Sequence, residues 1–384
     1  MREDNATVLR KQTGYSLVEL LIYVALMGIL GTLVFGSFIQ VMRPAIHETG
    51  IVETKLETSI GMDLLRMDLE HAGFGLPWDF NSVVPNPYNE PAPLAVSPSV
   101  PGAISSADLS VNSMNTSDYL VIRAMNVLQG ATSQKWGWVG RSAASAVSLQ
   151  TLTTTNFDVN DRVIVIRPVF GPGPTDQRQL IMDAANSYES RGNTVNLDPD
   201  YAPPAGPNDP NGERYLVYGV DNTGLRAPFN RTDYFINAPN ANGVAGSAHC
   251  APGTGTLVKT TMNHNGPPDF TYLPMMDCVA DFQVVYFLDT DTDGGWDTQV
   301  NANGLAALTA QQIRDQVKSI RCFVLAHEGG LDTAYTHPAA TITVGVSAAI
   351  GRQFDVSTLA GIGATWPNYR WKVYSLAVTP RNLK

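Results

Sequence analysis

The stretch KQTGYSLVELLIYVALMGILGTLVFGSFIQ, residues 11–40, decides how this chain is built. Its apolar part continues without a charged residue from Leu20 to Met42. About 20 such residues in an α-helix span a hydrocarbon core of roughly 30 Å. A single carboxylate, Glu19, stands at the start, where lipid makes its charge unfavourable unless a partner neutralises it. The stretch therefore predicts a membrane-spanning helix whose acidic residue has a function.

The charges on either side of this helix predict its orientation. Arg2, Arg10 and Lys11 precede it and Arg43 follows, so the positive-inside rule keeps the N-terminus in the cytoplasm and the body outside it. A cleavable secretory signal would have a shorter apolar region and a small-residue site after it, whereas the far end here reads FIQVMRPAIHE. Neither that alternative nor a plain membrane anchor explains Glu19.

The junction of KQTG (residues 11–14) with YSLVE (residues 15–19) resembles the type IV prepilin signal. In that family a basic leader ends in Gly, an N-methylated aromatic residue follows, and Glu is the fifth residue of the mature chain. Tyr15 stands here in place of the usual Phe. The resemblance implies that a prepilin peptidase cuts between Gly14 and Tyr15 and methylates the new amine. We expect Glu19 to pair with the N-terminal ammonium of Tyr15 in an adjacent subunit, because low dielectric strengthens the attraction.

Small residues recur every four positions within the apolar stretch. Gly28, Thr32 and Gly36 lie on one face of a helix, where small side chains let another helix approach closely. Glycine is also simply frequent in membrane helices, so both interpretations stay open.

The helix is expected to continue beyond the membrane. Pro44 should kink it without ending it. An amphipathic pattern then reaches about His71 and predicts an inward apolar face, followed by the helix-ending GFGLP at residues 73–77. The predicted inward residues are Leu56, Ile60, Leu64 and Met67. The predicted organisation is a leader at 1–14, a helix at 15–72 with its membrane span at about 20–42, and an extracytoplasmic body at 73–384.

The body is rich in short β-branched and aromatic runs separated by Pro, Gly and Asn. This spacing predicts an antiparallel sheet or a folded-over pair of sheets, with one intervening helix at about 309–318, and hence an α+β fold. The predicted strands are 118–124, 161–169, 214–220, 254–261, 278–288, 340–348 and 369–378. A long N-terminal helix packed on such a body is the plan of a pilin.

Several segments are similar to minor (low-abundance) pilins of the PilW type. The helix exit HAGFGLP shows this resemblance, and three later segments follow in the family's order: VADFQVVYFLDTDTDGG, IRDQVKSIRCFVLAHEG and YRWKVYSLAVTPRN. Residues 80–250 show none. The resemblance implies a protein of the inner membrane that joins other minor pilins and the major pilin to start pilus assembly. The alternatives are a J-type pseudopilin of type II secretion, or a tip adhesin that binds through the loops at 77–117 and 171–213.

Three cysteines would meet an oxidising compartment, where pairing is expected. Cys250 with Cys278 is the preferred bridge among three formal pairings, because both flank predicted strands and enclose a modest loop. Cys322 lies in the strand-like IRCFVLA and is expected to be buried.

The acidic segment DTDTDGGWD allows two interpretations. Asp289, Asp291, Asp293 and Asp297 place oxygens like the early positions of a calcium-binding EF-hand loop, but Val300 stands where a bidentate Glu belongs. The alternative is a turn whose Asp side chains bond local backbone. Apart from this possible calcium ion, no cofactor is predicted.

Other function classes find no support in the sequence. Charged residues make up 16%, with 35 acidic against 25 basic, and no basic run follows the N-terminus, so nucleic acid is not an expected partner. GxSxG, Walker A, GxGxxG and HExxH are absent, and the protein is expected not to be an enzyme. Trp136 and Trp138 fit core packing better than an exposed binding pair.

Overall fold

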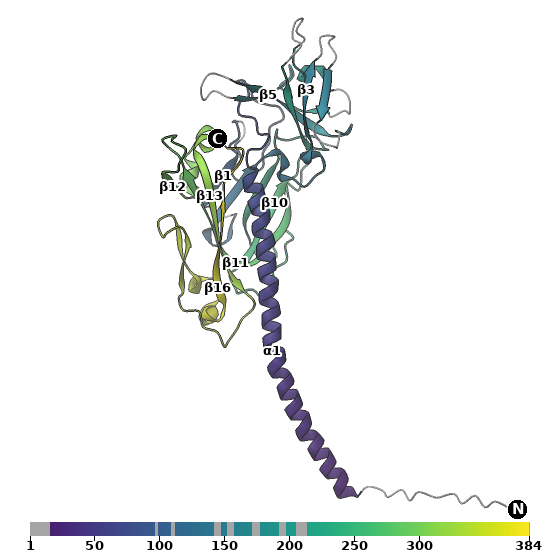
Figure 1. The fold of residues 1–384 in the computed structure, drawn as a ribbon, viewed down its shortest axis with the longest axis vertical. Helices are drawn as coiled ribbons and strands as arrows, with labels where there is room; N and C mark the ends of the chain where they lie inside the picture. Colours follow the sequence, from purple (N-terminus) through teal and green to yellow (C-terminus); the bar gives the residue numbers. More distant parts are fainter. Residues whose placement is uncertain are drawn as a thin grey trace, which may run out of the picture. The chain divides into compact units, whose positions relative to one another are not determined.

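The N-terminal helix is the first element of the chain (Figure 1). α1 covers Leu17–Glu70 and continues past Pro44, and the chain divides into two compact units between Val52 and Glu53. The computed structural model describes residues 16–96, 99–108, 112–141, 147–151, 157–170, 177–191, 197–204 and 213–383.

An eight-stranded antiparallel sheet forms the centre of the second unit. Its order is β1-β2-β9-β10-β11-β13-β16, with β12 paired to β11. The strands are β1 Ile104–Asp108, β2 Asp118–Arg123, β9 Arg231–Asn237, β10 Gly255–Met262, β11 Phe270–Leu288, β12 Thr298–Val300, β13 Val317–Glu328 and β16 Arg370–Val378. Central β11 is buried without interruption from Cys278 to Leu288, and its sequence there is mostly apolar on both faces, with Asp281 and Gln283 as buried polar exceptions.

A second, six-stranded sheet is built from the middle of the chain. Its order is β4-β3-β8-β5-β6, with β7 paired to β5, and Figure 1 labels β3 and β5. The strands are β3 Trp136–Arg141, β4 Val147–Thr151, β5 Arg162–Val169, β6 Gln177–Leu180, β7 Ser190–Arg191 and β8 Tyr215–Asp221. The predicted α+β class with a largely antiparallel body is thus confirmed, in its two-sheet form.

Smaller elements complete the second unit. β14 and β15 form a two-stranded ribbon, and α3 begins with a capping box in which Thr309 and Gln312 exchange hydrogen bonds. The predicted helix at 309–318 is two residues shorter at its end, because Val317 already belongs to β13. The bounds are α2 Ala302–Ala306, α3 Ala310–Gln316, β14 Thr341–Gly345, β15 Gly351–Asp355, η1 Met114–Thr116, η2 Met125–Val127, η3 Thr132–Gln134, η4 Pro199–Tyr201, η5 Val356–Thr358 and η6 Gly363–Asn368.

The main core joins α1 to both sheets. Its buried cluster includes Leu65 and Leu69 of α1, Phe282 of β11 and Ile164 of β5. After α1 the chain turns through the glycine-rich segment 73–77, which packs in this core. There Gly75 has φ +68°, and a Cβ on it would lie 2.5 Å from Met125 Cγ. The glycine there is required both by backbone conformation and by space.

The opposite faces of the two sheets carry separate clusters. Phe287 and Leu325 pack under the β14–β15 ribbon with Phe354.

Of the two tryptophans in β3, Trp136 packs against the main core, and the Arg214 guanidinium lies 4.2 Å from the ring centroid of Trp138. Both rings are half-buried, so packing is the interpretation that the structure favours.

A buried acid in β2 predicts an unusual pH dependence. Asp118 is 1% exposed, and one of its oxygens accepts a hydrogen bond from Val284 N at 2.6 Å. Burial raises the pKa of Asp118 well above its ordinary value, and Asp108, its partner across the β1–β2 pair, adds to the shift. The folded state therefore holds a proton that the unfolded chain loses above about pH 4. Its contribution to stability is complete below that pH and is lost as pH rises toward the folded-state pKa.

Asp118→Asn should consequently raise the melting temperature at pH 7, and the gain should shrink toward zero near pH 4. The amide oxygen of the introduced asparagine can still accept a hydrogen bond from Val284 N. The amide is neutral at every pH, so folding no longer requires protonation of a buried carboxylate. Thermal unfolding of the two proteins at several pH values checks this. A variant that is less stable than the parent at pH 7 would contradict it.

Candidate assembly interface

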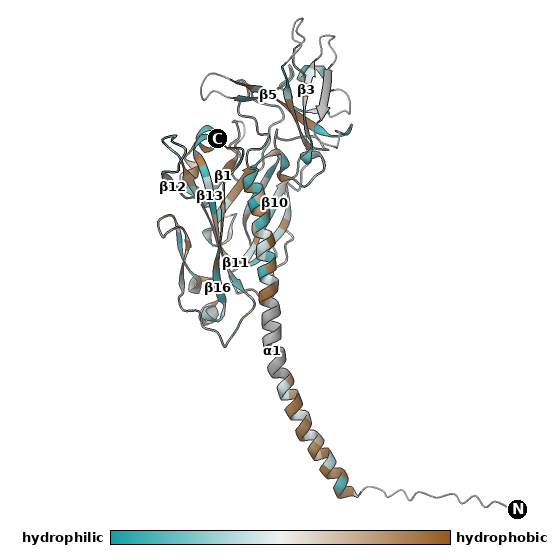
Figure 2. Cartoon of the chain, in the orientation of Figure 1, coloured by the Kyte–Doolittle hydropathy of each residue, from teal (hydrophilic) through white to brown (hydrophobic). Residues whose placement is uncertain are grey.

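The first half of α1 presents apolar side chains all round. Leu17–Phe38 is 22 residues long and apolar enough to cross a membrane, and it is not buried within the chain. Leu17 is 76% exposed and Phe35 is 66% exposed. Figure 2 colours most of this segment as hydrophobic. A helix that is apolar on every side needs lipid or other helices around it.

Glu19 lies in the first turn of this helix and is exposed. It is the one acidic residue of Leu17–Phe38 in the sequence, and no cation pairs with it among the described residues. The Ser16 hydroxyl accepts a hydrogen bond from Val18 N at 3.3 Å, which begins the helix. Gly14 and Tyr15 lie outside the described residues, so cleavage, methylation and the charge pair stay predictions.

The small-residue face is open in the single chain. A Cβ built at Gly28 or Gly36 would meet nothing within 4 Å. The Thr32 hydroxyl donates to Ile29 O at 2.8 Å, so its polar group is satisfied within the helix and does not oppose an apolar neighbour. Close packing against a second helix at Gly28, Thr32 and Gly36 remains a prediction.

The second half of α1 packs on the eight-stranded sheet. Thr54, Thr58, Leu65 and Leu69 are buried. Gly61 lies against β11, since a Cβ there would be 2.9 Å from the main-chain oxygen of Met275. Small residues on this face allow the helix to approach the strand closely.

A buried polar contact fixes the end of the helix on the sheet. The Asp68 carboxylate accepts from Lys259 Nζ at 2.6 Å and from the Tyr234 hydroxyl at 2.6 Å. Burial raises the pKa of Asp68 against the opposing attraction of Lys259. Because both partners lie on central strands, these contacts resist sliding of the helix along the sheet.

The inward face predicted from the sequence was wrong for three of its four residues, while Leu64 packs against the main core. Leu56, Ile60 and Met67 are 61%, 55% and 56% exposed, and Leu64 is half-buried. The face of α1 that packs on the sheet instead carries Thr54, Thr58, Gly61 and Asp68. Close approach at Gly61 and the ion pair between Asp68 and Lys259 stabilise this orientation of the helix. Leu56, Ile60 and Met67 therefore form an exposed apolar row, here called the outer stripe, beyond the apolar segment Leu17–Phe38.

Two family models match this chain. The model described as the prokaryotic N-terminal methylation motif covers residues 9–35, which include Gly14, Tyr15 and Glu19. The model described as type IV pilus-assembly protein W, PilW, covers residues 233–382. These two matches support a type IV pilin of the PilW type. No curated protein and no solved structure matches it.

The PilW match coincides with one part of the body. It begins within β9 and ends after β16, and so contains the strands β10, β11 and β13 at the centre of the eight-stranded sheet. The six-stranded sheet, from β3 to β8, lies outside it. The expected lack of resemblance over residues 80–250 therefore holds only up to residue 232, because the match already includes residues 233–250. The six-stranded sheet is carried in addition to the matched part.

The predicted disulfide is confirmed. Cys250 and Cys278 are bonded across a separation of 28 residues, and Cys322 is a buried free thiol whose pKa is raised by burial. Cys278 lies within β11 rather than at its start, because that strand begins at Phe270. The bond joins the segment before β10 to the central strand.

Removing the disulfide should lower the free energy of unfolding by about 3 kcal/mol, through greater freedom of the unfolded chain. The Cys250→Ser/Cys278→Ser protein should melt at a lower temperature than the oxidised parent and match the parent under reducing conditions. Equal melting temperatures of oxidised parent and double variant would contradict this.

The acidic loop forms a hydrogen-bonded turn. Asp289 accepts from Thr292 N at 2.7 Å and from Gly294 N at 3.0 Å, and Asp297 accepts from Thr290 N at 2.7 Å. Hydrogen bonds from Thr298 and Thr290 lower the pKa of Asp297 to about 2. These contacts are those of the turn interpretation.

The same loop leaves the calcium prediction open. Carboxylate oxygens of Asp289, Asp291 and Asp297 lie within 4.8 Å of one another, and Asp293 is outside this group, where it accepts from Gly295 N at 2.7 Å. Val300, in place of a bidentate acid, pairs with Tyr286 in the sheet. Calcium binding remains a prediction that a Ca²⁺ titration would check.

The loop at 77–117, one surface considered for an adhesin, is anchored by a buried ionic network that sequence reasoning missed. Glu90 accepts from Arg123 Nε at 2.7 Å and from Arg231 Nη1 at 3.0 Å, and all three side chains are 0% exposed. Arg231 also binds Asp233. The guanidiniums additionally donate to the carbonyl oxygens of Leu94, Pro91 and Pro93. This part of the loop is held against the sheet.

The other loop considered, 171–213, lies partly outside the described residues. Its described part contains β6, β7 and the short helix η4, so it belongs largely to the six-stranded sheet. Asp198 caps η4 by accepting from Asp200 N. Within the described residues, the segment 171–213 is therefore a structural part of the six-stranded sheet.

Proposed function

We propose that this PilW-type pilin is a minor pilin that takes part in starting type IV pilus assembly after cleavage and N-methylation by a prepilin peptidase. The observation that carries the proposal is the exposed acid Glu19 at the start of an all-round apolar helix, inside the matched methylation motif. Such a helix requires partners along its whole length, and its acid requires a cation. A neighbouring mature pilin supplies both.

Processing creates that cation. Cutting between Gly14 and Tyr15 removes Arg2, Arg10 and Lys11 and leaves an ammonium four residues before Glu19. In the low dielectric between packed helices, pairing of Glu19 with the ammonium of an adjacent subunit stabilises one axial register. The open face of Gly28, Thr32 and Gly36 then admits a neighbouring helix.

Partners and location follow from the same arrangement. The pilin starts as a single-pass protein of the inner membrane with its body in the periplasm, and it binds other minor pilins and the major pilin there. It is later present in the pilus at the cell surface. Its role is assembly by helix packing and charge pairing, without chemical turnover.

A J-type pseudopilin of type II secretion is the nearest alternative. It shares the leader and related topology, whereas the PilW match favours the pilus. Counting surface filaments and measuring secretion in one deletion strain separates the two: loss of secretion with normal filaments would assign the protein to secretion.

Glu19→Ala should fail to restore piliation to a strain that lacks the gene, with filament counts at least tenfold below those of the parent. Asp63→Ala is the matched control, because Asp63 is an exposed acid on the same helix outside the apolar segment, and it should restore filaments. Electron microscopy at native expression gives the counts. Normal piliation of the deletion strain, or full rescue by Glu19→Ala, would refute the assembly role.

Mass spectrometry tests the processing step separately. The mature chain should begin with N-methylated Tyr15. A mature protein that retains Met1 to Gly14 would contradict cleavage at this site.

A further inference from the structure

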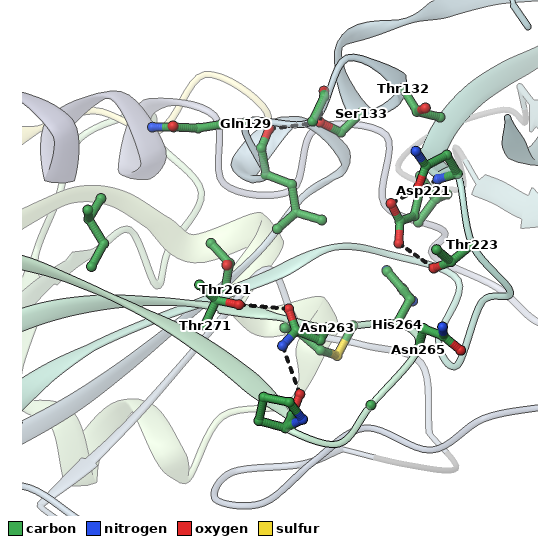
Figure 3. A pocket seen from close by; sticks show the side chains of 18 of the residues that line it. Gln129, Thr132, Ser133, Asp221, Thr223, Thr261, Asn263, His264, Asn265 and Thr271 are labelled. Atoms are coloured by element: carbon green, nitrogen blue, oxygen red, sulfur yellow. Dashed lines mark hydrogen bonds between the residues drawn. The ribbon is translucent and has the colours of Figure 1, made fainter. Parts of the chain in front are cut away.

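A cleft between the two sheets is lined by polar side chains that the assembly role does not use. It has a volume of about 640 Å³. The β10–β11 hairpin forms one wall, and the loops before β3 and after β8 form the other. In Figure 3, Thr132, Ser133, Asp221 and Thr223 lie on one side, and Thr261, Asn263, Asn265 and Thr271 lie on the other. Every lining residue belongs to the described part of the chain.

The lining is rich in hydroxyl and amide groups, and some of these are free. The side chains of Gln129, Thr261 and Asn265 have no hydrogen-bond partner among the described residues. Gln129 and Asn265 are exposed and Thr261 is half-buried. These side chains offer both donors and acceptors to a ligand.

Neighbouring groups are held rigidly. Asn263 donates to Pro268 O at 2.7 Å and accepts from Thr271 Oγ1 at 3.0 Å. Ser133 Oγ lies 2.7 Å from the carbonyl oxygens of both Leu128 and Gly130. A wall fixed before binding loses little freedom when a ligand arrives, which favours affinity.

The ionisable groups of the cleft are mostly neutralised. Lys259 is 3% exposed and paired with Asp68. His264 accepts from Arg226 N through Nδ1 and contacts Asn230 Oδ1 through Nε2, and burial lowers its pKa to about 4, so the ring is neutral at pH 7. Asp221 accepts from Asn222 N and from Thr223 Oγ1. Its remaining negative charge disfavours an anionic ligand.

Apolar surface accompanies these polar groups. Met262, Tyr272 and Leu273 also line the cleft, and Leu273 is 41% exposed. A ligand that suits the cleft therefore carries many hydroxyls, apolar C–H faces and no charge. The volume is in the range of ordinary small-ligand sites, about 300–1,000 Å³.

We propose that the cleft between the β10–β11 hairpin and the six-stranded sheet binds a neutral oligosaccharide through Gln129, Thr261 and Asn265. This gives the pilin a recognition function that is independent of its role in assembly. The site differs from the loops at 77–117 and 171–213, and only one of its walls comes from residues outside the PilW match.

The test uses the full-length protein in a detergent without a sugar head group. A printed array of neutral mono- to tetrasaccharides of glucose, galactose, mannose and N-acetylglucosamine is probed beside sialylated and sulfated glycans. The bound glycan is then measured by saturation-transfer NMR and calorimetry. Thr261→Val and Asn265→Ala remove free polar groups without touching the core, and Thr343→Val, on the exposed β14–β15 ribbon, is the matched control.

We expect neutral glycans to bind and both cleft variants to lose at least tenfold in affinity, while Thr343→Val binds like the parent. Melting temperatures should be unchanged. Absence of binding to neutral glycans, a preference for charged glycans, or equal affinity in the cleft variants would overturn the proposal. Filament counts with the same variants should match the parent, so failure here is distinguishable from failure of the assembly role.

Discussion

Replacing Glu90 with alanine should lower the free energy of unfolding by about 3–5 kcal/mol, which is typical when one member of a buried ion pair is removed. The side chains of Glu90, Arg123 and Arg231 are 0% exposed. Arg231 keeps Asp233 as a counterion, but Arg123 loses its sole carboxylate partner among the described residues. A buried guanidinium without a counterion is the main source of the expected loss.

The matched control is Glu213→Ala. Glu213 also pairs with an arginine at 2.7 Å, but both side chains of that pair are solvent-exposed, at 40% and 48%. We expect a change below about 1 kcal/mol there. Urea unfolding of the full-length protein in detergent, followed by tryptophan fluorescence, measures both. Similar midpoints for the two variants would show that the buried network does not hold the loop.

The network also illustrates what sequence patterns cannot reveal. Local patterns predicted many of the strands, the helix exit and the Cys250–Cys278 bridge, because β-branched runs, glycines and strand-flanking cysteines act through near neighbours. Strands such as β1, β3 and β9 were not predicted. Glu90 and Arg231 are 141 residues apart, and nothing around Glu90 marks it as buried. The cleft has the same origin, since its two walls come from segments around 130, 220 and 265 that meet only in the folded body.

The orientation of α1 was mispredicted for a different reason. The sequence contains two candidate faces, one with Leu56, Ile60 and Met67 and one with Thr54, Thr58, Gly61 and Leu65. Hydropathy alone favours the first. The sheet selects the second because Gly61 permits close contact and Asp68 reaches Lys259, and both preferences depend on residues of distant strands. The outer stripe is then left exposed.

Gly61→Leu should destabilise this docking by about 4 kcal/mol, beyond the ~1–3 kcal/mol of ordinary overpacking. In an exposed helix, replacing glycine would be favourable by about 1 kcal/mol. At Gly61, however, a Cβ would lie 2.9 Å from Met275 O, and this main-chain atom cannot rotate aside as a side chain can. To avoid this clash, the helix has to move away from β11, which weakens the contacts of Leu65 and Asp68.

Ser59→Leu is the matched control, because Ser59 is an exposed residue of the same helix, and we expect a change within about 0.5 kcal/mol. Hydrogen exchange should rise over residues 54–70 in Gly61→Leu alone, and its melting temperature should fall. The proposed assembly role predicts that piliation falls with it. Equal exchange in the two variants would mean that close contact at Gly61 does not hold the helix on the sheet, and that the Asp68–Lys259 pair is sufficient.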